Sequence, residues 1–252
     1  MNDEQIRISA QNLSSFALLN CCNRCLWLKL RLQFSLPYQT LHGVSSFIES
    51  YTKRIVSTHF ERFGKLPGWF SEFGEFSEVV PVPHYSKFYI VDEETNIKLT
   101  GTPDQILLRK DSSYSIINYE STKFTSAKDA LLPVYKVRLN AYALIAESVG
   151  LKPVRQIGLI HYRPHTDVIE TAIGEPNGLV SYDNFLMGFG SHCVQIELKP
   201  DEIIRPLLKK VRALWEKDEA PRGIINCEDC GKLYNLITLL GRRQKSDIST
   251  VS

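Results

Sequence analysis

The order of the predicted elements in the middle of the chain constrains its fold more than any other feature. Residues 97–109 and 113–120 alternate apolar and polar side chains and predict two strands joined by a tight hairpin. Residues 126–149 carry apolar side chains at helical intervals, and residues 156–162 form a continuous apolar run typical of a buried strand. Pro133 interrupts the helical pattern, so this helix either kinks or starts there. Strands and helices that alternate in this way predict an α/β fold with a central mixed sheet.

Helical patterns flank this central region on both sides. Residues 8–32 and 40–63 precede it, and residues 200–217 follow it, each with apolar residues at helical spacing. The sequence contains no internal repeat and no long linker. We therefore expect one domain over residues 1–240, followed by a disordered basic tail over residues 241–252.

Composition limits the function classes without selecting one. The formal net charge of the 252 residues is only +2, so any polyanion site must be a local concentration of lysine and arginine. No stretch approaches the roughly 18 apolar residues of a membrane-spanning helix, and we expect no membrane partner. The polar, acidic start does not suit a secretory signal, which predicts a cytoplasmic protein whose six cysteines are reduced or bound to metal.

Three polar side chains gather near the predicted hairpin. Asp104 follows a Gly-Thr-Pro turn, and Asn118 and Glu120 lie two residues apart on one face of the next strand. Carboxylates that converge from adjacent strands can hold Mg²⁺ or Mn²⁺, and such an ion polarises a phosphate and activates water. The alternative is that these residues are polar strand ends with no chemical role.

The same residues resemble the motifs of the PD-(D/E)XK nuclease superfamily, and in particular the RecB-like branch that includes the CRISPR adaptation nucleases. That branch shows Gly-x-x-Asp, then a strand that ends in Asp-Tyr-Lys-Thr, then a helix with Gln-x-x-x-Tyr. The corresponding segments here are Gly101-Thr-Pro-Asp104, Ile116-Ile-Asn-Tyr-Glu-Ser121 and Arg138-Leu-Asn-Ala-Tyr142. The resemblance covers roughly residues 8–235 and implies a restriction-endonuclease-like core with the two ends of the chain brought together.

Three positions depart from that pattern. Asn118 stands where the family has an acid, Glu120 where it has the lysine that activates water, and Arg138 where glutamine is usual. A glutamate at position 120 adds negative charge that can hold a metal more tightly, although an ionised glutamate cannot donate a hydrogen bond. Some members of the superfamily also carry glutamate at the lysine position. The catalytic set that the resemblance implies is Asp104, Asn118, Glu120, Arg138 and Tyr142.

Further residues complete the expected nuclease site. Lys123 is a candidate replacement base, although strand alternation places it on the opposite face from Glu120, and Arg138 is better placed to bind a phosphate. Glu78, or Glu75, is a candidate third metal ligand, and the resemblance suggests His42 as another. Arg205, Lys209 and Arg212 cluster on the last predicted helix, where they either follow a nucleic-acid backbone or form a solvated face.

Two cysteine pairs lie near opposite ends of the chain. Cys22-x-x-Cys25 and Cys227-x-x-Cys230 each have the spacing with which two thiolates grip one metal. Together they predict a four-thiolate site for Zn²⁺ or for a [4Fe–4S] cluster. The cluster is what the resemblance implies, although relatives use one N-terminal and three C-terminal cysteines. The alternative for the first pair is core packing within an apolar helix, which is also our expectation for Cys193.

The sequence thus leaves three functional hypotheses. The first is a divergent nuclease-family domain that acts on or binds DNA, as single strands or ends, through a metal site with altered ligands. The second is a catalytically inactive scaffold of the same fold for DNA or protein binding in a repair or defence complex. The third is an α/β interaction protein stapled by zinc.

Overall fold

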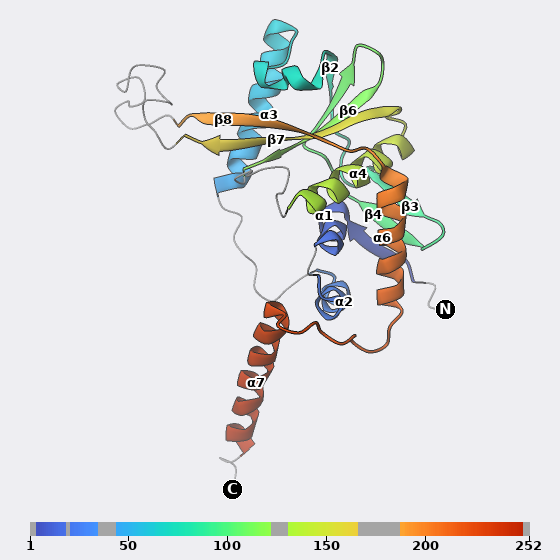
Figure 1. Cartoon of the computed structure of the whole chain (residues 1–252), viewed down its shortest axis with the longest axis vertical. Helices are drawn as coiled ribbons and strands as arrows, with labels where there is room; N and C mark the ends of the chain where they lie inside the picture. The colour runs from blue at the N-terminus through green and yellow to red at the C-terminus, as the bar shows by residue number, and fades with distance from the viewer. Residues whose placement is uncertain (1–3, 19–20, 35–43, 122–130, 166–186, 249–252) are drawn as a thin grey trace.

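The computed structural model describes residues 4–18, 21–34, 44–121, 131–165 and 187–248. Within this part, two mixed sheets are flanked by helices (Figure 1). The smaller sheet has the order β1-β4-β3, and the larger has the order β2-β5-β6-β7-β8. The strands are β1 (Ile6–Ser9), β2 (Phe76–Val80), β3 (Tyr89–Asp92), β4 (Ile97–Thr100), β5 (Gln105–Arg109), β6 (Tyr114–Glu120), β7 (Val154–Pro164) and β8 (Phe189–Ile196).

Helices cover the two faces of the larger sheet. Along β6, Ile116 packs into the core under α4 (Leu132–Ser148), whereas Ile117 and Tyr119 pack into a second core with Val56 of α3 (Val44–Phe63). Because alternate strand residues point to opposite faces, α4 and α3 lie on opposite sides of the sheet. The remaining helical elements are α1 (Ala10–Ser14), η1 (Ser15–Ala17), α2 (Asn23–Arg31), η2 (Gly68–Phe73), α6 (Pro200–Trp215) and α7 (Glu228–Ile248).

The central prediction is confirmed with one important change. The β5–β6 hairpin, α4 and β7 follow in the expected order, and β6 and β7 run parallel on either side of the α4 crossover. Pro133 lies in the first turn of α4, so it starts the helix and does not kink it. The predicted strand over residues 97–109, however, is two strands that belong to different sheets.

Gly101 explains that division. Its φ is +150°, and a Cβ atom at this position would lie 2.8 Å from Cε1 of Tyr142. Only glycine lets the backbone pass this close to α4 while it leaves one sheet for the other. A similar break separates β2 from β3, where Pro81 and Pro83 remove backbone donors that a continuous strand would need.

The two ends of the chain depart from their predicted form. The expected helix over residues 8–32 is instead β1, α1, η1 and α2, which lie in the lower part of the body beside α6 (Figure 1). The segment predicted as a disordered tail begins at residue 241, whereas α7 continues to Ile248 and projects from the body (Figure 1). Residues 242–248 contain good helix formers and neither proline nor glycine, which allows the helix to continue. No helix in the described residues is long and apolar enough to cross a membrane.

Candidate functional site

The two cysteine pairs meet at the start of two helices. Cys22 is the N-cap of α2 and Cys25 lies in its first turn, while Cys227 directly precedes α7 and Cys230 lies in the first turn of that helix. The first helical hydrogen bonds have the same pattern in both, from Leu26 N to Cys22 O at 2.9 Å and from Gly231 N to Cys227 O at 3.0 Å. Both pairs therefore sit at the positive end of a helix dipole, which favours thiolates.

The four sulfur atoms are close enough to share one metal ion. Sγ of Cys25 lies 3.4 Å from Sγ of Cys230 and 3.6 Å from Sγ of Cys227, and Sγ of Cys22 lies 3.7 Å from Sγ of Cys230. Thiolates about 2.3 Å from a tetrahedral Zn²⁺ stand about 3.8 Å from one another. All four cysteines are free thiols without disulfides, so the predicted cluster is confirmed as a set that can hold a metal such as Zn²⁺.

The thiols of Cys22 and Cys25 have pKa values shifted in opposite directions. Burial acts to raise the pKa of Cys22, but hydrogen bonds from the backbone of Cys25 and Ile224 outweigh it and lower that pKa to about 6. Burial and the neighbouring sulfurs raise the pKa of Cys25 well above its usual range. Such a divided set is expected where several thiols crowd together, because one thiolate makes the next harder to form.

The connection between α6 and α7 is fixed to α2 on its way to the cysteines. Arg31 lies between the rings of Trp27 and Trp215 and donates hydrogen bonds to the carbonyl oxygens of Trp215 and Lys217, each at 2.8 Å. Arg24 donates to the carbonyl oxygen of Pro221 at 3.0 Å. These contacts bring the C-terminal cysteines to the N-terminal pair.

The carboxylate centre lies where β5 begins, after Asp104, and where β6 ends, at Glu120. The backbone N–H of Asp104 donates to Oδ1 of Asn118 at 3.3 Å, and the N–H of Tyr119 donates to Oδ2 of Asp104 at 2.9 Å. Glu120 closes β6 on the same face as Asn118. The structure therefore places Asp104 against Asn118, and Glu120 lies two residues further along the same face of β6.

Both carboxylates are paired with cations of the chain itself. Nζ of Lys53, on α3, lies 2.6 Å from Oδ1 of Asp104. The guanidinium of Arg138, on α4, forms an ion pair with Glu120 and donates to Oε1 of Gln11 at 2.7 Å. In the described part of the chain, the cysteine cluster is the sole group of three or more side chains placed to hold a metal ion. Both carboxylates are thus engaged by cations of the chain, and a Mg²⁺ or Mn²⁺ ion at this centre stays a prediction.

Arg138 and Tyr142, two residues of the predicted catalytic set, are both buried. Arg138 is 8% exposed, and burial lowers the pKa of its guanidinium, which Tyr142, Asp104 and Glu49 oppose. Tyr142 is buried against Gly101, and burial raises the pKa of its hydroxyl to about 12. That Arg138 binds a phosphate stays a prediction, and its guanidinium already pairs with Glu120 and donates to Gln11.

The other predicted ligands lie elsewhere. Glu78 is exposed and pairs with Leu108 in the β2–β5 ladder. Leu108 lies four residues after Asp104 on β5, which places Glu78 about 13 Å from Asp104 at about 3.3 Å per residue. Glu75 forms an ion pair with Lys110 at 2.7 Å. Neither acid can join the carboxylate centre. His42 and Lys123 fall outside the described residues.

The cations of α6 bind the β3–β4 turn. Arg205 contacts Oδ1 of Asp92 at 3.0 Å, Lys209 contacts Glu94 at 2.7 Å, and Arg212 donates to the carbonyl oxygen of Thr95 at 2.7 Å. Their contact with nucleic acid stays a prediction, since these side chains already fix α6 to the smaller sheet.

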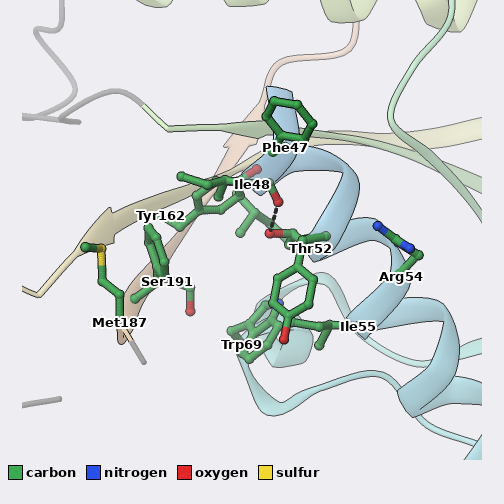
Figure 2. A pocket seen from close by; sticks show the side chains of 12 residues that line it. Phe47, Ile48, Thr52, Arg54, Ile55, Trp69, Tyr162, Met187 and Ser191 are labelled. Carbon is green, nitrogen blue, oxygen red and sulfur yellow. Dashed lines mark hydrogen bonds between the residues drawn. The ribbon is translucent and has the colours of Figure 1, made fainter. Parts of the chain in front are cut away.

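An apolar groove beside α3 was not anticipated. It has a volume of about 620 Å³ and lies between α3, Trp69 and the strands β7 and β8 (Figure 2). Phe47 and Tyr51 are 76% and 62% exposed, whereas Ile48 and Val56 on the adjacent stripe of α3 face the core. In the sequence, the apolar residues of α3 cover a wider face than one buried stripe needs. That width is the sequence feature that indicates a second, exposed apolar stripe.

Lys53 and Gln11 are the site residues that the sequence did not suggest. Lys53 follows Glu49 by one helical turn, a spacing that by itself predicts only a surface ion pair on α3. Its contact with Asp104 depends on how α3 packs against the sheet, and no local pattern encodes that.

Comparisons with known proteins do not place the chain in a family. No protein-family model and no curated protein matches it. Among solved structures, the chain is similar to one described as "Crystal structure of SSO0001", with 13% sequence identity and a TM-score of 0.43 over 86% of this chain and 80% of that one. A likeness at this level identifies neither a family nor an activity.

Proposed function

We propose that this chain is a module that binds single-stranded nucleic acid, is built on a restriction-endonuclease-like core, and does not cleave what it binds. The groove beside α3 carries the proposal. Five of its twelve lining residues are aromatic, one is an arginine and none is an acid. The aromatic set is Phe47, Tyr51, Trp69, Tyr162 and Phe189.

Stacking gives such a groove its chemical use. A base has two apolar faces, and base–aromatic stacking contributes about 1–3 kcal/mol per base. Tyr51 and Phe47 are exposed on consecutive turns of α3. Arg54 at the margin of the groove offers a charge for phosphate (Figure 2).

The nuclease-like core is supported by the way the three motif segments converge. Gly101 packs against Tyr142, Asp104 contacts Asn118, and Glu120 pairs with Arg138. Three segments that are separate in the sequence thus meet at one place, in the order that the resemblance implies. Their carboxylates are neutralised internally, which supports binding without hydrolysis.

We further propose that the four cysteines hold Zn²⁺ and fix α7 to α2. The sulfur separations of 3.4 to 3.7 Å suit a single ion. A [4Fe–4S] cluster places its thiolates on four different irons, and therefore farther apart. Purified protein should contain one zinc per chain and lose it in Cys230→Ser but not in Cys193→Ser. A brown protein with absorbance near ~400 nm would instead indicate iron and sulfur.

Binding is tested by fluorescence anisotropy with labelled oligothymidylate. Tyr51→Ala and Phe47→Ala should each weaken binding by roughly 5- to 160-fold, the loss of one stacked base. Tyr85→Ala is the matched control, because Tyr85 is an exposed aromatic outside the groove. Equal binding by wild type and Tyr51→Ala, or no binding by wild type, refutes this role for the groove and favours a protein partner there.

Hydrolysis is tested separately with the same oligonucleotides and with duplex DNA in Mg²⁺ or Mn²⁺. We expect no cleavage. Cleavage that disappears in Asp104→Ala would show that the carboxylate centre is catalytic and would overturn the non-hydrolytic part of the proposal.

A further inference from the structure

The carboxylate of Asp104 has both oxygens engaged by the protein. Oδ1 forms an ion pair with Nζ of Lys53 at 2.6 Å, and Oδ2 accepts a hydrogen bond from the backbone N–H of Tyr119 at 2.9 Å. The Asp104 side chain is only 15% exposed, so little water competes for these contacts. A divalent ion would have to displace Lys53 before it could bind Asp104.

We propose that Lys53 is a built-in counter-ion that takes the place of a divalent cation at Asp104, and that its removal opens a latent cation site there. This inference rests on the non-hydrolytic part of the proposed function and is independent of the groove. It assigns Lys53 a positioning role, since its ammonium neutralises Asp104 and holds α3 against the edge of the hairpin.

Lys53 and Arg138 differ in how easily they can be removed. Arg138 is nine-tenths buried and is held by both Glu120 and Gln11. Lys53 is 39% exposed, and Asp104 is the one partner found for its ammonium in the described residues. Loss of the Lys53 charge should therefore uncover Asp104 while the Arg138 contacts keep the hairpin and α4 in place.

The field that Lys53 balances is negative. Glu49 lies one turn before Lys53 on α3, and its charge reaches the centre, because it raises the pKa of both Arg138 and Tyr162. Without Lys53, Asp104 and Glu49 would act on the centre with one fewer cation to oppose them. A divalent cation near Asp104 is then attracted more strongly, because the repulsion from the Lys53 ammonium is gone.

The experiment is Mn²⁺ binding to the zinc-loaded protein, followed by calorimetry and by the electron spin resonance signal of free Mn²⁺. Lys53→Ala should bind Mn²⁺ at least roughly tenfold more tightly than wild type, since a unit charge that repels the ion has been removed. Lys53→Arg should behave like wild type, and Lys53→Ala with Asp104→Asn should lose the gain. Arg54→Ala removes a neighbouring α3 cation that does not contact Asp104 and should bind Mn²⁺ no better than wild type.

Two results would overturn the inference. One is Asp104-dependent Mn²⁺ binding by wild type as tight as that of Lys53→Ala, which would show that Lys53 does not compete with the metal ion for Asp104. The other is a folded Lys53→Ala, or a folded Lys53→Gln where alanine prevents folding, that gains no affinity. Oligothymidylate binding is measured in parallel, so failure of the groove proposal is separate from failure here.

Discussion

Replacement of Arg138 by methionine should be the most destabilising single change in the carboxylate centre. Methionine keeps much of the apolar stem of the side chain but removes the guanidinium that pairs with Glu120 and donates to Gln11. The Glu120 side chain is 14% exposed, so it would be left as a largely buried charge without its partner. Removal of one member of a buried pair typically costs about 3–5 kcal/mol.

The residual exposure of Glu120 places the expected loss at the lower end, about 3 kcal/mol in the free energy of unfolding. In a chain of this size 1 kcal/mol corresponds to about 2–4 °C, so Tm should fall by about 6–12 °C. The assay is urea unfolding of the zinc-loaded protein followed by tryptophan fluorescence. Lys209→Met is the control, because its ion pair with Glu94 is exposed and should contribute less than about 1 kcal/mol.

A double-mutant cycle isolates the pair. Glu120→Gln alone leaves a buried guanidinium and should also destabilise, while Arg138→Met with Glu120→Gln should lose less than the two single changes added together. If each single change costs less than about 1 kcal/mol and the effects are additive, the pair is effectively solvated and this account of the centre is refuted.

Three further predictions concern other parts of the fold. Gly101→Ala should lower the free energy of unfolding by about 1–3 kcal/mol, because the new Cβ meets Tyr142 at 2.8 Å on a backbone with φ +150°; unchanged urea stability would contradict the close approach. Cys193 is buried and donates to the carbonyl oxygen of Trp69, and burial raises the pKa of its thiol to about 11, so mass spectrometry should find it unalkylated by iodoacetamide at about pH 8 until the protein unfolds. Hydrogen bonds from Lys136 and Lys199 lower the pKa of Glu197 to about 2. The ionised Glu197 therefore stabilises the folded protein at pH values above the usual glutamate pKa, and this contribution is lost as the pH falls toward 2. The Tm difference between wild type and Glu197→Gln should therefore shrink over that interval, and a constant difference would exclude titration of Glu197 as its source.

The hairpin, α4 and β7 could be predicted because their periodicities are local. Alternation in residues 113–120 and the 3.6-residue pattern of α4 directly reflect which faces are buried. The division of residues 97–109 between two sheets could not be predicted in this way. It depends on the approach of Gly101 to Tyr142, a contact between segments forty residues apart.

The cysteine cluster and the carboxylate centre differ in how much of each could be predicted from the sequence. The meeting of Cys22 and Cys25 with Cys227 and Cys230 was predictable across two hundred residues, since each pair alone has an incomplete ligand set and the chemistry requires the other. The partner of Asp104 was not, because a lysine on an amphipathic helix suits solvent equally well. Only the packing of α3 decides that Lys53 reaches Asp104.

Two of the positions that differ from the expected nuclease motif carry opposite charges that pair with each other. Position 120 has glutamate where the pattern has lysine, and position 138 has arginine where the pattern has glutamine, and these two side chains form an ion pair. A change at either position alone would leave a buried charge unmatched. Glu120→Lys should therefore destabilise the protein strongly by placing two cations together, whereas Glu120→Lys with Arg138→Gln should recover most of the loss. Urea unfolding of wild type and the two variants measures this, and equal stability of the single and double variants would show that the two positions are not coupled.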